Sequence, residues 1–374
     1  MNPLSRLAYR ALRPLGDSSQ LARSALRGIR NAAHVAQHTI GGAAPVLIRP
    51  HTVNLTVAIT ARCNQRCTGC LYERGFMAGQ QLPLRVMEEM VDDAAALGVR
   101  SLRLYGGEPL LHADLPRVVE RATQQGLDAY VTTNGVLLAE KIDELVAAGL
   151  RQLTFGYYGH GDAYDEYVGR RGNHARLERG LATVRERHGQ TVRMRMNWLL
   201  MRPTCDLDAL QAAWEFADRY DTPLQVDLVH YSLPYFTEGK ERELQFTPED
   251  RPRIDAIVRQ LLEWKRRFPD RIENSEIGLR SIPDWLLLGP RMRVPCDKYR
   301  MVWIGADGTV QLCYVTFELG NLHRQRLRDL LYTDQHEAAA RDAFALRCPN
   351  CHCGFDERTR KHLPTRMRFL RDPT

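Results

Sequence analysis

The chain has 374 residues, a formal net charge of +7, 44% hydrophobic residues and 26% charged residues. This length and hydrophobic content suffice to bury a full core and exclude a wholly disordered chain. No apolar run approaches the ~20 residues that a membrane-spanning helix needs, which excludes an integral membrane protein. The sequence therefore predicts one large folded domain with a smaller appendage.

Residues 1–50 form a basic leader that lacks the uninterrupted apolar stretch of a secretory signal. Its leucines and arginines recur at roughly helical spacing, so we expect an accessory helix whose basic face is solvated or meets a membrane surface or a partner. The nine cysteines are odd in number and bunched, which favours metal ligation in a reducing cytoplasm over a disulfide framework. The positive charge accompanies no nucleic-acid-reading motif, so no nucleic acid partner is expected.

From residue 51 to 231, apolar strands alternate with amphipathic helices. The predicted strands are 52–60, 101–105, 127–133, 150–158, 191–200 and 224–231. The predicted helices are 82–98, 115–126, 139–149, 174–189 and 207–220. This alternation is typical of an α/β fold with a parallel sheet, which right-handed crossovers would curl into a partial (β/α)6 TIM-like barrel.

The texture changes beyond the barrel. Residues 232–290 predict a helical connecting segment on the substrate side, with a long helix at 251–268. A boundary near residue 290 leads to a small C-terminal α+β domain at 291–356. It contains a hairpin at 301–315 around an Asp-Gly turn and a helix at 326–344. A basic tail, 357–374, closes the chain.

Three cysteines follow the first strand in "CNQRCTGC", at Cys63, Cys67 and Cys70. Their thiolates can converge on one face of a metal group but do not close a four-ligand site. Either a fourth ligand comes from elsewhere in the chain, or the site is open for a substrate. "GGEP" (106–109) follows the second strand and "TNG" (133–135) the third, so all three motifs are expected at the same rim of the barrel.

This set of motifs resembles the radical S-adenosylmethionine (radical SAM) enzymes over roughly residues 52–231. The resemblance implies that the three cysteines ligate three irons of a [4Fe–4S] cluster, whose fourth iron binds S-adenosylmethionine (SAM). It further implies reductive cleavage of SAM to a 5′-deoxyadenosyl radical, which abstracts hydrogen from an unactivated C–H bond. A reductase such as flavodoxin or ferredoxin would supply the electron.

The resemblance also suggests which residues bind SAM. They are Tyr72, Gly106, Gly107, Glu108, Pro109, Thr133, Asn134, Arg171 and Asn197. The chain departs from the family pattern at Gly69, where an aromatic residue is usual, and at 155–159, where a small hydroxyl residue is usual. Tyr72 is therefore expected to help hold the adenine.

Some rim residues have competing interpretations. Arg171 could pair with the SAM carboxylate, or belong to a solvated arginine pair with Arg170. His160 and Tyr231 are the candidate catalytic residues, and ordinary packing is the competing interpretation for each. Cys205 is interpreted as structural, with a role as a hydrogen donor left as the alternative.

A second set of cysteines lies near the C-terminus. Cys296, Cys313, Cys348 and Cys351 resemble the ligand set of the SPASM/twitch extension that some radical SAM enzymes carry. This implies one auxiliary [4Fe–4S] cluster, with Cys353 as the alternative to Cys351. Four thiolates also bind zinc, so a zinc site is the competing interpretation.

Together these resemblances imply a radical SAM oxidoreductase or modifying enzyme of biosynthesis. Its substrate would be a natural product or a peptide, and the auxiliary cluster would assist oxidation, crosslinking or epimerisation. No segment resembling a peptide-leader-binding domain precedes the barrel, which favours a small molecule. A maturase acting on a partner protein is one alternative. A zinc- or iron–sulfur-binding structural or interaction protein is the alternative from another class.

Overall fold

The structure is a computed structural model that describes residues 32, 35–231, 236, 239–313 and 316–371. Within these ranges one nine-stranded sheet has the order β6-β5-β4-β3-β2-β1-β7-β8-β9. Its strands are β1 (Asn54–Thr60), β2 (Ser101–Gly106), β3 (Asp128–Thr133), β4 (Gln152–Tyr157), β5 (Arg193–Leu200), β6 (Leu224–Leu228), β7 (Met301–Ile304), β8 (Thr309–Gln311) and β9 (Glu318–Asn321). The strands β1 to β6 are parallel, which confirms the predicted α/β partial barrel.

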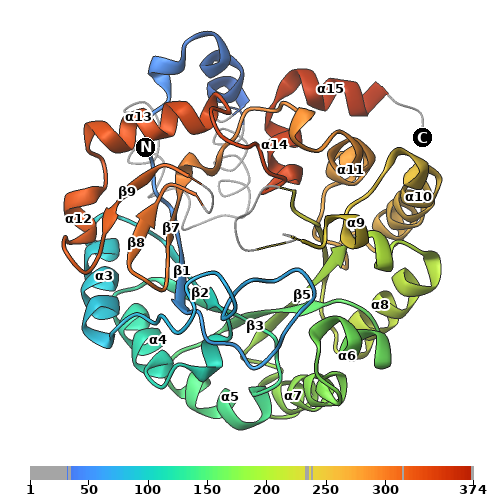
Figure 1. The fold of residues 1–374 in the computed structure, drawn as a ribbon, viewed down its shortest axis with the longest axis horizontal. Coiled ribbons are helices and arrows are strands. Elements are labelled where there is room, and N and C mark those ends of the chain that lie inside the picture. Colours follow the sequence, from blue (N-terminus) through green and yellow to red (C-terminus); the bar gives the residue numbers. More distant parts are fainter. Residues whose placement is uncertain (1–31, 33–34, 232–235, 237–238, 314–315, 372–374) are drawn as a thin grey trace, which may run out of the picture.

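Helices cover the outer face of this curved sheet (Figure 1). The helices that follow strands β1 to β5 are α3 (Leu84–Ala96), α4 (Leu115–Gln124), α5 (Leu138–Ala147), α6 (Asp162–Val168), α7 (Asn173–His188) and α8 (Leu207–Arg219). On β4, Phe155 and Tyr157 pack against Phe216 of α8. Alternate strand residues therefore face the helices, and the residues between them face the concave side of the sheet.

The C-terminal half of the chain contributes the remaining helices. Its helices are α9 (Glu241–Leu244), α10 (Arg251–Arg267), α11 (Glu276–Leu288), α12 (Leu327–Leu330), α13 (Asp334–Phe344), α14 (Phe355–Lys361) and α15 (Leu363–Arg371). The sequence analysis did not anticipate α11, whose pattern is interrupted by Pro283. It also did not anticipate α14, which begins two residues before the expected basic tail, or α15 within that tail. None of the described helices is long and apolar enough to cross a membrane.

The expected small domain shares its sheet with the barrel. The strand β7 pairs in parallel with β1, from Asn54 opposite Met301 to Val57 opposite Ile304. The predicted hairpin is present, because β8 turns back on β7 through Asp307 and Gly308. The boundary near residue 290 stays a prediction, and the strands beyond it extend the main sheet.

The prediction of a single helix at 326–344 is wrong. Tyr332 adopts a φ of 65°, a left-handed conformation that ends α12. Thr333 then caps α13, because its hydroxyl accepts a hydrogen bond from the His336 amide. A residue with positive φ cannot continue a helix, and the periodicity alone did not show this.

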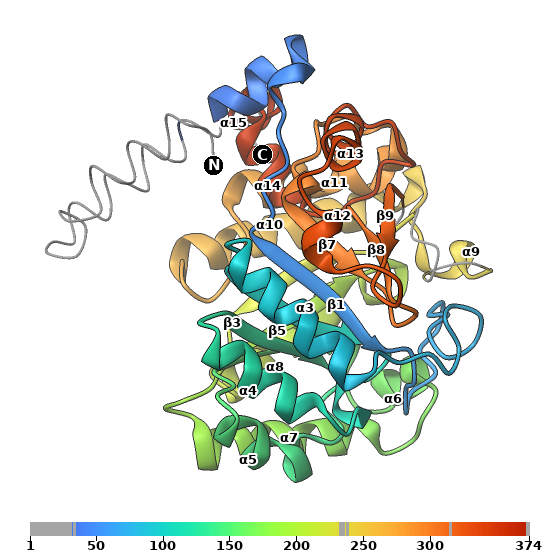
Figure 2. The ribbon, with the colours of Figure 1, turned by 90° about the vertical axis from the view of Figure 1, so that its left-hand side faces the viewer.

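Most of the predicted leader helix, residues 1–31 and 33–34, lies outside the described residues. Residues 35–43 are helical, and the ring of His38 packs edge-on against Phe344 of α13, with centroids 5.2 Å apart. This part of the leader lies at the same end of the molecule as α15 (Figure 2). The loop that follows β1 emerges at a different end, close to α6.

Candidate functional site

The cysteine loop, residues 63–70, is held on two sides by main-chain hydrogen bonds. On one side, the Gly107 amide donates to the Thr60 carbonyl and the Glu108 amide to the Arg62 carbonyl, each at 2.8 Å. On the other, the Thr68 amide donates to the carbonyl of Tyr167 in α6, also at 2.8 Å. The GGEP motif and α6 therefore fix the loop at the carboxyl end of β1.

The three loop thiols face a common, desolvated space. Burial raises the pKa of Cys63 to about 12 and raises that of Cys67 well above its ordinary value. The neighbouring thiols at Cys63 and Cys70 raise the pKa of Cys67 further. Three thiolates at this place need a cationic group to balance them, which fits the iron of a cluster. No three His, Cys, Asp or Glu side chains among the described residues are close enough to hold a single metal ion.

A wall of tyrosines behind the cysteine loop was missed as a group by the sequence analysis. Tyr158, Tyr164 and Tyr167 pack together, with the rings of Tyr158 and Tyr167 4.8 Å apart and those of Tyr158 and Tyr164 stacked at 6.0 Å. Burial raises the pKa of all three, and the Cys67 thiol adds to the shift in each. Within the described part of the chain, the buried Tyr167 hydroxyl has no hydrogen-bond partner, so it is a donor available to a group held by the loop. The i, i+3 spacing of Tyr164 and Tyr167 after the fourth strand was the available signal.

Glu108 connects the GGEP and TNG motifs. The Thr133 hydroxyl donates to its Oε1 at 2.7 Å, and the Asn134 amide donates to its Oε2 at 2.7 Å. The Leu110 amide also donates to Oε1, at 2.9 Å. Burial raises the pKa of Glu108 to about 7, against the lowering effect of these donors. The carboxylate therefore fixes the turn after β3.

That turn is tied to the cysteine loop as well. The Asn134 side chain donates from Nδ2 to Oδ1 of Asn64 at 2.7 Å. Thus the ends of β1, β2 and β3 form one connected network, as their expected position at one rim implies.

The two glycines of GGEP allow a close approach of main chains. A Cβ on Gly107 would lie 2.3 Å from the Arg62 carbonyl oxygen and 2.5 Å from that of Ala61. Gly106 has a φ of 135°, and a Cβ there would lie 2.2 Å from the Thr60 carbonyl oxygen. Pro109 then begins a short 3-10 helix, Pro109–Leu111, which turns the chain away from the rim. Any side chain at Gly107 would displace the start of the cysteine loop.

Gly69 adopts a left-handed φ of 78°, a conformation that an aromatic residue at this position would not favour. Tyr72 lies close by in a small cluster of buried hydrophobic side chains, where its hydroxyl donates to that of Tyr105 at 3.2 Å. The Trp303 indole also donates to the Tyr105 hydroxyl. The expected contact between Tyr72 and the adenine stays a prediction.

The remaining sequence-predicted residues occupy separate places. Arg171 is exposed in the turn between α6 and α7. Asn197 lies on the concave side of β5, with its Nδ2 3.4 Å from Oδ2 of Asp227 on β6. His160 is exposed, accepts or donates a hydrogen bond with Tyr157 at 3.1 Å, and lies against His174. These contacts place His160 on the helix-facing side of β4.

Tyr231 is held by main-chain groups. Its hydroxyl donates to the Leu286 carbonyl of α11 at 2.6 Å and accepts from the Phe246 amide at 3.3 Å. His160 and Tyr231 have separate hydrogen-bond partners, and their catalytic roles stay predictions. Cys205 is fully buried in the main core, in line with a structural cysteine.

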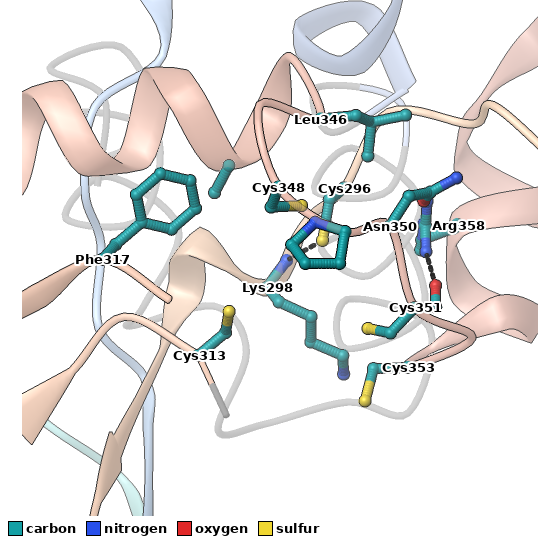
Figure 3. A pocket seen from close by; sticks show the side chains of 12 residues that line it. Cys296, Lys298, Cys313, Phe317, Leu346, Cys348, Asn350, Cys351, Cys353 and Arg358 are labelled. Atoms are coloured by element: carbon teal, nitrogen blue, oxygen red, sulfur yellow. Dashed lines mark hydrogen bonds between the residues drawn. The ribbon is translucent and has the colours of Figure 1, made fainter. Parts of the chain in front are cut away.

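The second set of cysteines lines one pocket (Figure 3). The cysteines are Cys296, Cys313, Cys348, Cys351 and Cys353. Burial raises the pKa of Cys296 to about 12, and a hydrogen bond between Cys351 and Cys353 lowers the pKa of Cys351. The last two thiols are therefore immediate neighbours. The assignment of Cys351 rather than Cys353 as the fourth ligand stays a prediction.

Arg358 of α14, which the sequence analysis placed in the basic tail, shapes this auxiliary pocket. Its side chain is fully buried and stacks on Trp285, 4.7 Å from the ring centroid. The guanidinium donates to the carbonyls of Cys351 at 2.7 Å and Val294 at 2.5 Å, and to Oδ1 of Asn350 at 2.9 Å. It therefore binds together the two chain segments that carry the thiols.

Comparisons with known proteins match both sites. The family model of the radical SAM superfamily matches residues 57–199, and that of an iron–sulfur cluster-binding domain, SPASM, matches residues 296–353. The GTP 3′,8-cyclase of Streptomyces coelicolor is 30% identical over 313 residues, which cover 77% of this chain and 83% of that enzyme. The GTP 3′,8-cyclase of Chlorobaculum tepidum is 45% identical, but the matched part spans 29% of its length.

Solved structures share the fold at low sequence identity. Native anSMEcpe with bound AdoMet has a TM-score of 0.61 and 16% identity, covering 85% of this chain and 96% of that one. SuiB of Streptococcus suis bound to the precursor peptide SuiA has a TM-score of 0.59 and 15% identity, covering 86% and 72%. With its open three-cysteine loop, its parallel partial barrel and its second cysteine pocket, the chain belongs to the radical SAM superfamily and carries a SPASM iron–sulfur domain.

Proposed function

We propose that the protein abstracts hydrogen from an unactivated C–H bond of a natural-product or peptide substrate, with the auxiliary cluster assisting the net oxidation, crosslinking or epimerisation. One observation carries this proposal: the chain just after β6 contacts both cysteine sites. Nδ1 of His352, which lies between Cys351 and Cys353 in the chain, is hydrogen-bonded to the Val229 carbonyl at 3.0 Å. Seven residues further, Phe236 forms a β-bridge with Cys70 of the cysteine loop.

The cofactors and the chain have separate tasks. When bound, the [4Fe–4S] cluster and SAM supply a 5′-deoxyadenosyl radical at the cysteine loop, while the auxiliary cluster supplies an electron-transfer group at the second pocket. The chain positions the loop through Gly107, Glu108 and Asn134. The tyrosine wall excludes water from the sulfur atoms.

The concave face of the barrel supports a polar substrate. Arg103, Asn197 and Asp227 alternate with the helix-facing residues of their strands and are partly exposed there. Arg103 donates from Nε to the Thr132 hydroxyl at 2.9 Å, which fixes the position of its guanidinium relative to β3. A substrate with hydroxyl, amide or carboxylate groups would find partners on this face.

Two observations favour narrower alternatives. The Streptomyces coelicolor relative is named as a GTP 3′,8-cyclase, which makes GTP a candidate substrate. The structural neighbours include SuiB with a precursor peptide and anSMEcpe with a peptide, which favour a peptide or a maturase acting on a partner protein. The reductase and the membrane contact of the leader remain predictions.

Deuterium transfer tests the proposal and separates these substrates. The anaerobically reconstituted, reduced protein is incubated with SAM and one of three deuterated samples. The samples are GTP, a peptide fraction and a small-metabolite extract, the last two from cells of the source organism grown in deuterated medium. We expect deuterium in 5′-deoxyadenosine with one sample, which identifies the substrate class. Cleavage of SAM without deuterium uptake in all three would contradict the proposal.

A further inference from the structure

Lys298 extends into the auxiliary pocket among the cysteine side chains (Figure 3). Its main-chain amide donates to the sulfur of Cys296 at 3.4 Å. Its side chain runs along the turn that carries Cys351 and Cys353, because a Cβ on Gly354 would lie 3.0 Å from the Lys298 nitrogen and 2.7 Å from its Cε. The ammonium group therefore ends beside the last two thiols.

The carboxylates nearest to Lys298 form ion pairs with a different cation, Lys361. Nζ of Lys361 lies 2.6 Å from Oδ2 of Asp297 and 2.6 Å from Oε1 of Glu357. Among the described residues, no carboxylate oxygen lies within the 4.0 Å ion-pair distance of the Lys298 nitrogen. The guanidinium of Arg358 is also committed, to main-chain and amide oxygens on the other side of the pocket.

A partly buried ammonium that has no carboxylate partner needs negative charge from another source. The carboxylates of Asp297 and Glu357 also attract the ammonium, but neither lines the pocket. Among the lining residues, the thiols are the only groups that can become negatively charged, because Arg358 is a cation. A cluster held by four thiolates is anionic, and reduction by one electron increases its negative charge. A fixed cation beside it stabilises the reduced form more than the oxidised form.

We propose that Lys298 is the countercharge of the auxiliary cluster and raises its reduction potential. In this role Lys298 makes the auxiliary site a better electron acceptor without ligating it. The inference goes beyond the proposed function, because the potential of the auxiliary site can be measured without any substrate. A failure of the deuterium experiment would leave it unaffected.

The test is a redox titration of the reconstituted full-length protein, followed by electron paramagnetic resonance. A background variant in which the three loop cysteines are alanine assigns the auxiliary signal. We expect Lys298→Met to lower the midpoint potential of that signal by at least about 59 mV, which corresponds to a tenfold change in the one-electron equilibrium constant. Lys298→Arg should retain most of the wild-type potential, because it keeps the charge.

Arg347→Met is the matched control. Arg347 precedes Cys348 directly, but its side chain is 72% exposed and paired with Asp342 at 2.6 Å. Removing this charge should change the potential little, because water screens it. An equal shift in Lys298→Met and Arg347→Met, or no shift in either, would overturn the proposal.

The iron content of each variant distinguishes a change in potential from loss of the auxiliary cluster. If Lys298→Met does not retain its auxiliary iron, Lys298→Gln is measured in its place. Loss of the cluster from Lys298→Arg as well would overturn the proposal, since the retained charge would then not suffice.

Discussion

Gly107→Ala tests whether the close approach of the GGEP loop to the cysteine loop creates the SAM site. The added Cβ would lie 2.3 Å from the Arg62 carbonyl oxygen, where real Cβ contacts stay above 3.0 Å. One of the two main chains must therefore move by about 0.7 Å or more. Both clashing atoms belong to backbone, so no side-chain rotation can relieve the contact.

The size of the effect follows from that displacement. Overpacking of this kind costs roughly 1–3 kcal/mol, and misplacing a reacting group by ~1 Å can cost about 100-fold in rate. If the loop relieves the strain by leaving its position, SAM should bind roughly tenfold to 100-fold more weakly. The formation of 5′-deoxyadenosine should fall by at least as much, while the iron content stays close to that of the wild type.

The assay is equilibrium dialysis of SAM against the reconstituted protein, together with the initial rate of 5′-deoxyadenosine formation. Gly75→Ala is the matched control, since it lies just after the cysteine loop and a Cβ there meets no atom within 4 Å. Wild-type SAM affinity in Gly107→Ala would refute the reasoning. An equal loss in Gly75→Ala would refute it too.

Three further predictions follow from the two sites. Burial raises the pKa of Glu108 from 4.5 to about 7, so the folded state holds this proton more tightly than the unfolded state. Without SAM, the free energy of unfolding should therefore fall by up to roughly 3 kcal/mol between pH 4.5 and pH 7 from this group. Urea unfolding should show a shallower fall in Glu108→Gln, and an identical slope would contradict the assignment. Replacing the three loop cysteines by alanine should abolish 5′-deoxyadenosine formation and reduce the iron content from about eight to about four atoms per chain. Alanine at Cys296 and Cys313 should cause the same loss of iron but spare the first cluster. Arg358→Met should lower the thermal stability and the auxiliary iron content, because each buried acceptor left unpaired costs roughly 1–3 kcal/mol, and Arg360→Met, which removes a surface ion pair, should do neither.

The sequence predicted the barrel well because each strand and helix carries its own period. The strand 191–200 alternates between helix-facing and concave residues, and the structure places β5 at Arg193–Leu200. The break between α12 and α13 was missed because it depends on one residue, Tyr332, with positive φ, while the hydrophobic pattern continues on both sides of it. Helix α11 was missed because Pro283 lies inside it.

The sequence by itself indicated the chemistry of the two cysteine sets, because the spacing of the cysteines in each set and the order of GGEP and TNG can be read directly along the chain. Only the tertiary structure decided what surrounds them. The β7 strand joins β1, Glu108 turns to hold Asn134, and Lys298 and Arg358 meet in one pocket although 60 positions separate them in the chain. Such contacts form between elements that are far apart in the sequence, and they depend on burial and on the pairing of buried charges. A local sequence pattern therefore does not predict them.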